Sequence, residues 1–415
     1  MNKTILIFSF VLFNCFLSFS QEKDTVKTLT SLNKSAAQFE RDTLLKQENS
    51  PLDIGDDRGI YILTKDGQMQ LRILGSVRFS LLYDLKDIPV KKTFNTYYIP
   101  VGEDSKNIPN YYGSLNQTRI GFEINRQVGK DVVLIRLETD FNGKNGAYRI
   151  RHAYGEVGRF LVGQTWSLFS NVSSLPTMVN SKGPTGSVTL RTAQMRYSDT
   201  NRKGTRWAAA LEYSRPDLNL QQLDTTGFSV VQIIPDVTAR IEREGIFGAV
   251  QLSVAFTTVS IRDQDNNVSN FGGYGGSLSG DLRINEKNKI LYQLTYGKSI
   301  SHFITNFAGT GNDVIYNPNT GEFDPVDSFG GFLAYGFTMT KKIKANASIG
   351  YANLSNEDYQ PGNSYRNSFS GALDCFWQIA PGARLGVEYI YGTRWNKDSS
   401  SGSAGRLQAL FYYDF

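Results

Sequence analysis

The last ten residues of the chain read Arg406-Leu407-Gln408-Ala409-Leu410-Phe411-Tyr412-Tyr413-Asp414-Phe415. Successive side chains of an extended strand point to opposite faces, so this stretch presents two different surfaces. One face is apolar and consists of Leu407, Ala409, Phe411, Tyr413 and Phe415. The other face is mostly polar and carries Arg406, Gln408, Tyr412 and Asp414. The pattern predicts a strand with one apolar side and one wet side.

The opposite end of the chain predicts a secretory signal peptide over residues 1–20. Lys3 supplies a positive charge, and a largely apolar run extends from Ile5 to Phe19. The small residues Ser18 and Ser20 stand just before the predicted cleavage point, as a signal peptide requires. The alternative is an anchoring membrane helix. It is disfavoured because the run is shorter than the roughly 20 residues that a span needs.

Composition favours a β-barrel of the bacterial outer membrane. A strand that ends on an aromatic residue is typical of the closing strand of such barrels. Aromatic residues form 13% of the chain, which suits the aromatic girdles of a barrel at the two membrane surfaces. The mean hydropathy is only −0.32, because every second residue of a barrel strand faces away from lipid. No later apolar run reaches helix length, which argues against a helical membrane protein.

Long and short connections alternate along the chain, and they separate runs in which apolar and polar residues alternate. Long connections are expected near 85–113, 142–146, 167–187, 215–236, 261–270, 299–328, 353–366 and 395–404. Short ones are expected near 126–130, 157–159, 199–205, 243–247, 283–288, 340–344 and 380–383. The pattern predicts an all-β fold, a transmembrane antiparallel β-barrel of about 16 strands over residues 59–415. Its short turns would face the periplasm, and a barrel of this size leaves an aqueous channel.

Residues 21–58 have a different character. Val26, Leu29, Leu32, Ala36 and Phe39 form a short apolar stripe at helical spacing among polar residues. The stripe spans barely two heptads, fewer than a confident coiled-coil assignment needs. We expect a short periplasmic extension, either a helix that oligomerises or a disordered segment.

Signals for catalysis, metal binding and nucleic-acid binding are weak. Two histidines, His152 and His302, are the only ones in the chain, and no nucleophile motif accompanies them. The alternation puts His152 on one strand face with Ile150 and Tyr154, which indicates a structural role. Cys375 is the only cysteine after the signal peptide, which excludes a disulfide framework or a cysteine metal site. The net charge of +5 is mild and no basic helix is visible. We expect no enzyme activity, no cofactor, no metal and no nucleic-acid partner.

The residues that are expected to determine function are the charged side chains of the predicted pore. A charged side chain is inexpensive in a wet lumen and costly on the lipid face, so the alternation assigns charged strand residues to the lumen. The predicted pore-lining residues are Arg72, Arg78, Arg119, Arg136, Glu138, Asp140, Arg149, Arg151 and Arg196. Glu123 and Glu212 share that side. Rings of arginine favour anions, whereas the alternative is that these charges pair across strands and brace the wall.

Three blocks resemble the DcaP-type porins: residues Tyr148–Tyr154, Phe160–Phe169 and Arg191–Tyr197. The resemblance extends from about residue 60 to Phe415, and Gly163-Gln164-Thr165-Trp166-Ser167 is its most specific part. It implies a trimeric porin that passes small, preferably negatively charged solutes such as dicarboxylates. By the match, Arg149, Arg151 and Arg196 are candidate pore-lining residues. The segment after Trp166, rich in Ser, Asn and Gly, is a candidate constriction loop.

The function predicted from the sequence is passive diffusion of small anionic or polar solutes through an outer-membrane porin. The expected partners are those solutes, outer-membrane lipid and two further copies of the chain in a homotrimer. The alternative is a surface adhesin or structural barrel whose function lies in the long loops. An outer-membrane enzyme is disfavoured, because no nucleophile and histidine form a recognisable catalytic arrangement.

Overall fold

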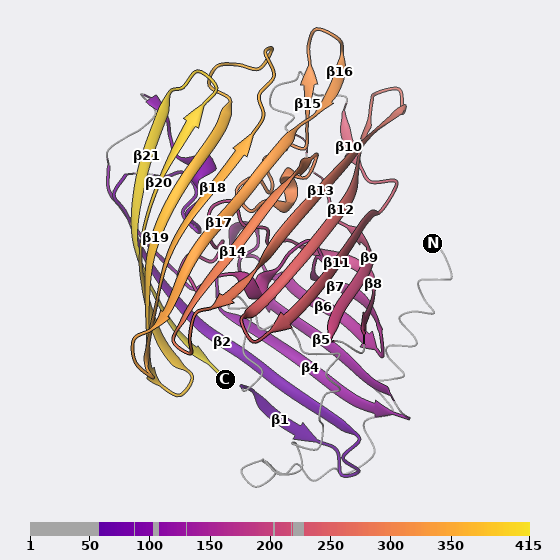
Figure 1. Cartoon of the computed structure of the whole chain (residues 1–415), viewed down its shortest axis with the longest axis vertical. Coiled ribbons are helices and arrows are strands. Elements are labelled where there is room, and N and C mark those ends of the chain that lie inside the picture. Colours follow the sequence, from indigo (N-terminus) through magenta and orange to yellow (C-terminus); the bar gives the residue numbers. More distant parts are fainter. Residues whose placement is uncertain are drawn as a thin grey trace.

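A closed antiparallel barrel forms the fold (Figure 1). The computed structural model describes residues 58–86, 88–102, 108–129, 131–201, 204–216, 218 and 228–415. Within these residues the ring has 16 strands, which confirms the predicted fold class and strand count. In order, they are β2 (Met69–Asp84), β4 (Arg119–Val128), β5 (Asp131–Asp140), β6 (Arg149–Val157), β7 (Phe160–Trp166), β8 (Arg191–Thr200), β9 (Thr205–Tyr213), β11 (Asp236–Gly245), β12 (Gly248–Arg262), β13 (Val268–Arg283), β14 (Asn288–Lys298), β17 (Asp327–Thr338), β18 (Ile343–Leu354), β19 (Tyr365–Ala380), β20 (Ala383–Asn396) and β21 (Ser401–Asp414).

Short elements extend the ring or decorate its loops. Two short strands pair with β2, namely β1 (Ile60–Leu63) and β3 (Asn110–Ser114). A third, β10 (Ser229–Val231), pairs with β12. β15 (Val314–Asn317) and β16 (Glu322–Pro325) form a separate hairpin. The 3-10 turns are η3 (Thr96–Tyr98), η5 (Lys144–Gly146), η6 (Val172–Ser174) and η8 (Ser301–Phe303). No helix in this described part is long and apolar enough to cross a membrane. The predicted signal peptide and all but the last residue of the predicted extension lie outside the described residues.

Long and short connections alternate as predicted. Tight turns join β4 to β5, β6 to β7, β8 to β9, β11 to β12, β13 to β14, β17 to β18 and β19 to β20. The other connections include the long segments between β2 and β4, β7 and β8, and β14 and β17. The tight turns gather at the lower end of the barrel in Figure 1, and the long loops gather at the upper end. We refer to these as the short-turn end and the long-loop end.

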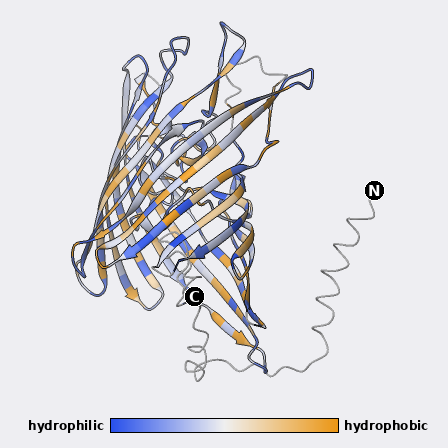
Figure 2. Ribbon diagram, turned by 45° about the vertical axis from the view of Figure 1, so that its right-hand side comes forward, coloured by the Kyte–Doolittle hydropathy of each residue, from blue (hydrophilic) through white to orange (hydrophobic). Residues whose placement is uncertain are grey.

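Each strand has an exposed apolar face and a buried inner face (Figure 2). On β12, Leu252 and Phe256 are 51% and 60% exposed, whereas Gln251 and Ser253, on either side of Leu252, are each 1% exposed. The final strand behaves in the same way, with an exposed Phe411 and a fully buried Arg406. The period of two predicted from the sequence is therefore the period of the wall, apolar outside and largely polar inside.

The two ends of the wall meet at the last residue. The backbone N–H of Gly75 donates to the Phe415 carbonyl at 2.9 Å, and the Phe415 N–H donates back at 3.0 Å. A Cβ atom on Gly75 would lie only 2.3 Å from the Phe415 ring. Glycine at position 75 therefore lets the tip of the terminal ring pack directly on β2, where the barrel closes.

One predicted face is wrong. Ile150 and His152 were expected on the same side of their strand, but Ile150 is 51% exposed and His152 is 3% exposed. The pairing of β5 with β6 shifts between Glu138 and Thr139, so the chain has a β-bulge here. The bulge adds one residue and inverts the alternation, which brings both Arg151 and His152 to the inner side. His152 Nδ1 lies 3.0 Å from the Thr165 hydroxyl, in agreement with a structural role.

Neighbouring residues of β12 test the face assignment. Leu252→Asp should impair barrel assembly, because it places a charge on the outer face between Ile241 and Leu278. Charges there cost on the order of 2–4 kcal/mol for Arg or Lys at the membrane midplane, and less for Asp. The matched control, Ser253→Asp, places the same charge on the inner face opposite Arg240 and should assemble normally. The yield of heat-modifiable folded protein measures both variants, and equal losses would contradict the assignment.

Candidate functional site

The connection between β7 and β8, residues 167–190, crosses the interior of the barrel; we call it the inner loop. Its backbone N–H groups donate to side chains on the far wall. Val179 donates to Glu388 of β20 at 2.9 Å, and Val188 donates to Gln293 of β14 at 2.8 Å. Because those strands lie across the ring from β7, the segment after Trp166 folds inward, a point that the sequence leaves open.

Buried carboxylates hold the inner loop in place. Glu212 accepts the Leu168 N–H at 2.9 Å, and Glu388 accepts the Asn180 N–H at 2.9 Å. Asp374, next to Glu388 in the β19–β20 register, accepts the Val179 N–H at 3.0 Å. These hydrogen bonds pair backbone N–H groups that the buried loop would otherwise leave without partners. We call Glu212, Asp374 and Glu388 the loop anchors.

Glycines in the wall let the inner loop lie directly on the strands. A Cβ atom on Gly350 of β18 would lie 2.2 Å from the Thr185 carbonyl oxygen. A Cβ atom on Gly330 of β17 would lie 2.5 Å from the Gly186 carbonyl oxygen. Any larger residue at either position would push the inner loop toward the middle of the channel.

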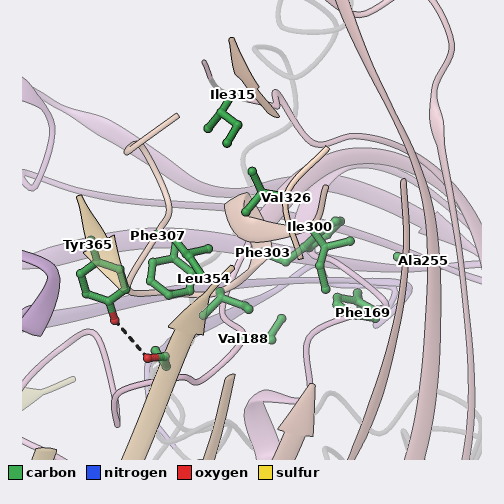
Figure 3. Packing of buried hydrophobic residues seen from close by; sticks show 12 residues of the cluster. Phe169, Val188, Ala255, Ile300, Phe303, Phe307, Ile315, Val326, Leu354 and Tyr365 are labelled. Atoms are coloured by element: carbon green, nitrogen blue, oxygen red, sulfur yellow. Dashed lines mark hydrogen bonds between the residues drawn. The ribbon is translucent and has the colours of Figure 1, made fainter. Parts of the chain in front are cut away.

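Two further segments fill the interior near the long-loop end. The loop that contains η8 pairs with the inner loop, since the Thr305 N–H donates to the Ser187 carbonyl at 2.8 Å. The segment that contains η3 reaches the same place, where Asn306 donates to the Thr96 hydroxyl at 2.8 Å. An apolar cluster joins the segments, and Figure 3 shows Phe303 and Phe307 of one loop beside Val188 of the other. The channel is therefore narrowed by three packed segments.

Charged side chains form a connected set of ion pairs on the inner side of β2, β4, β5 and β6. Its members, the arginine ladder, are Arg72, Arg119, Glu123, Arg136, Glu138, Asp140, Arg149 and Arg151. Glu138 is the centre, at 2.7 Å from both Arg136 and Arg151 and 4.0 Å from Arg119. Arg136 continues the chain of contacts to Glu123 at 3.8 Å.

The two ends of the arginine ladder differ in exposure. Arg72 pairs with Glu123 at 3.6 Å, and both side chains are almost fully buried. Arg149 forks onto Asp140 with hydrogen bonds of 2.9 and 2.6 Å, yet its side chain is 44% exposed. Arg149 is thus the member of the arginine ladder most open to a passing solute.

All nine residues predicted to line the pore lie on the inner side of the wall, and seven of them belong to the arginine ladder. Arg78 is separate, 3.9 Å from Asp414 and 5.2 Å from the ring centre of Tyr412. Arg196 of β8 is half-buried, in register with the inward-facing Leu161 and Ala210.

Some residues that shape this interior are not predicted by the sequence pattern. The alternation assigns Asp374 and Glu388 to the inner face. Nothing local shows that they hold a loop about two hundred residues away in sequence, as their hydrogen bonds to Val179 do. Lys182 of the inner loop donates to the Thr305 carbonyl at 3.0 Å. No sequence signal marks it, because it lies in an irregular segment.

Comparison with known proteins agrees with this geometry. The family model of the DcaP outer membrane protein matches residues 56–415. The crystal structure of the outer membrane channel DcaP of Acinetobacter baumannii is similar, with 21% identity, a TM-score of 0.73, and coverage of 85% of this chain and 99% of that one. A search of curated proteins found no match.

More distant porins share the fold. The anion-selective porin from Comamonas acidovorans has 8% identity and a TM-score of 0.56, over 84% of this chain and 100% of that one. OmpF of Salmonella typhi, in complex with daunomycin, has 10% identity and a TM-score of 0.54, over 85% of this chain and 99% of that one. The chain belongs to the DcaP outer membrane protein family, whose members are channels of the bacterial outer membrane rather than enzymes.

Proposed function

We propose that this porin passes small hydrophilic solutes by passive diffusion and favours small anions such as carboxylates. The observation that best supports this preference is the charge of the two surfaces that face the channel. The arginine ladder covers one part of the inner wall, and the inner loop, which narrows the channel, contains no Asp or Glu. A channel narrowed between such surfaces has a positive potential, which raises the local concentration of anions.

The charges of the arginine ladder do not cancel. It contains five arginines and three carboxylates, which leaves an excess of two positive charges. Arginine stays charged at all relevant pH values and forks onto carboxylates, so Arg149, with its half-exposed side chain, is the best placed to contact a solute. The contact must be weak, because tight binding would stop release.

The inner loop adds to this potential. Lys182 is the only charged residue between 167 and 190. The loop anchors are acidic, but their oxygens accept backbone N–H groups, which offset part of any negative charge that they carry. The acidic residues around the inner loop therefore reduce the positive potential of the arginine ladder only weakly.

A triple variant, Arg149→Ser, Arg151→Ser and Arg196→Ser, tests the anion preference. The reversal potential of a single channel under a KCl gradient should move toward cation preference, while conductance is kept or raised. The effect should weaken as salt rises, since screening acts over about 8–10 Å at physiological ionic strength. Glu138→Gln with Asp140→Asn should move the potential in the opposite direction. If the unmodified channel prefers cations, or if the reversal potential of the triple variant is unchanged, the arginines only stabilise the wall through ion pairs.

A variant of one loop anchor tests the role of the inner loop. Glu388→Ala leaves the buried Asn180 N–H without its acceptor, which costs on the order of 1–3 kcal/mol, and leaves the Val179 N–H with Asp374 alone. We expect larger and noisier single-channel currents, with the barrel still folded. Glu388→Gln keeps an acceptor oxygen and should change the current less. Currents identical to those of the unmodified channel would show that the inner loop does not limit flow.

We also propose that three copies of the chain assemble, as the family resemblance implies. Cross-linking and native mass measurement in mild detergent should give a homotrimer. Deletion of residues 21–50 should leave the barrel folded, because all described strands begin at Ile60 or later. Detection of monomers alone would refute the assembly, and collapse of the barrel would show that the extension is needed for folding.

A further inference from the structure

Four inward-facing polar side chains lie side by side against the inner loop; we call them the polar row. They are Asn346 of β18, Asp374 of β19, Glu388 of β20 and Gln408 of β21, and the strand register places each beside the next. All four are more than nine-tenths buried. The Asn346 amide donates to the Thr177 carbonyl at 2.6 Å, and the Gln408 amide donates to Glu388 at 2.5 Å. The two carboxyl groups therefore lie together in the middle of the polar row, with an amide at each end.

The two carboxyl groups share one donor. The Val179 N–H donates to Asp374 Oδ1 at 3.0 Å and to Glu388 Oε2 at 2.9 Å. The same Glu388 oxygen also accepts the Asn180 N–H at 2.9 Å. The two carboxyl groups lie within hydrogen-bond distance of each other. A hydrogen bond between them requires a proton on one of them, because an ionised carboxylate can only accept.

One oxygen of this pair lacks a donor, and the pair lacks a cation. Asp374 Oδ2 is buried and has no hydrogen-bond partner. Within the described residues, no ion pair involves Asp374 or Glu388. Two buried carboxylates that lie side by side without a cation repel each other, so both are not ionised together. A single proton between the two groups would provide the missing hydrogen bond and remove one of the two charges.

The other ionisable side chains near the polar row do not neutralise it. On the elements packed against it they are Lys344 of β18, Cys375 on the outer face of β19, Arg384 of β20, Arg406 and Tyr412 of β21, Arg78 and Asp84 of β2, Lys91 of the segment after β2 and Lys182 of the inner loop. Arg406 forks onto Asp84 at 2.6 and 3.1 Å, and Arg384 donates to the Tyr412 hydroxyl at 3.2 Å. Lys182 donates to a backbone carbonyl of the loop that contains η8, at 3.0 Å.

We propose that Asp374 and Glu388 bind one proton between them, and that this proton holds the inner loop against the far wall. With the proton bound, the pair carries one negative charge and accepts the Val179 and Asn180 N–H groups. Loss of the proton puts two negative charges side by side, and their repulsion separates the carboxyl groups. The Val179 N–H then loses one acceptor and the inner loop loosens. The channel therefore opens further at alkaline pH, a consequence that rests on the proposed role of the inner loop in limiting flow.

Infrared difference spectra of the purified full chain in detergent detect the proton directly. At neutral pH, the spectrum of the unmodified chain minus that of Asp374→Asn should show the carbonyl band of a protonated carboxyl group. Glu388→Gln should remove the same band, because the carboxyl group that remains in either variant has no second charge beside it and ionises. Heat-modifiability confirms folding of each variant.

Asp140→Asn is the matched control for the infrared measurement. Asp140 is also a buried, inward-facing aspartate, but it is paired with Arg149 and Arg151 and is expected to be ionised. Its substitution should leave the carboxyl band in place. Absence of the band from the unmodified chain, or a band that survives Asp374→Asn or Glu388→Gln, would overturn the shared proton.

Single-channel currents measured over a range of pH test whether the proton holds the inner loop. From about pH 6 to about pH 10, a range in which buried carboxyl groups are known to lose their protons, the unmodified channel should become noisier and more conductive. Asp374→Asn keeps a neutral group with an acceptor oxygen beside Glu388, so it should keep the low-pH current throughout. Lysines that titrate in this range are present in both channels and do not separate them. An equal dependence on pH in the two channels would overturn the proposed release of the loop.

The infrared measurement does not depend on flow through the channel, so the two proposals fail separately. If the band is present but Glu388→Ala carries the same current as the unmodified channel, the shared proton stands and the inner loop does not limit flow. If the band is absent but Glu388→Ala carries a larger current, the inner loop limits flow and the shared proton is refuted.

Discussion

The hydrogen bonds that close the ring are the constraint on which the structure depends. No backbone N–H or C=O group can remain unpaired in hydrocarbon, so a sheet that crosses a membrane must have no free edge. Here the first and last ring strands, β2 and β21, pair from Ser76–Asp414 to Asp84–Arg406, and Phe415 completes the pairing against Gly75. The apolar terminus that predicted the fold is therefore also the segment that removes the last free edge. Closure then fixes which side of each strand meets lipid and which side encloses water.

Closure of sixteen strands creates an interior that the strands cannot fill. Three segments from the long-loop end occupy it, and their positions depend on polar contacts with the wall rather than on strand pairing. Glu212 binds the start of the inner loop and Glu388 binds its middle, both through backbone N–H groups, and Gly350 lets the loop touch the strand. These contacts satisfy backbone groups that an irregular segment would otherwise bury unpaired. The width of the channel is thus set by a few inward-facing side chains, while the wall sets only its outer limit.

The sequence predicted what depends on local periodicity and did not predict what depends on contacts across the ring. Alternation in β12 and β21 gave the faces, and the spacing of turns gave the strand count, because both are properties of consecutive residues. The inner position of His152 was missed, since a bulge at Arg151 depends on the partner strand. The bonds from Val179 and Asn180 to Glu388 join residues more than two hundred positions apart. No pattern in either segment indicates the other, so only the assembled barrel brings them together.

The sequence leaves two alternative roles for the charged residues: they brace the wall, or they select solutes. In the arginine ladder the two roles are compatible. Pairing with Glu138 spreads Arg119, Arg136 and Arg151 across neighbouring strands, so each arginine is held without closing the channel. A buried charge without a partner is strongly unfavourable, and therefore a positive wall of this density needs some carboxylates. Three carboxylates among five arginines hold the side chains in place and still leave an excess of positive charge. Under the proposed anion preference, the ion pairs that stabilise the wall would also hold the excess positive charge in place, with Arg149 at the exposed end of the arginine ladder.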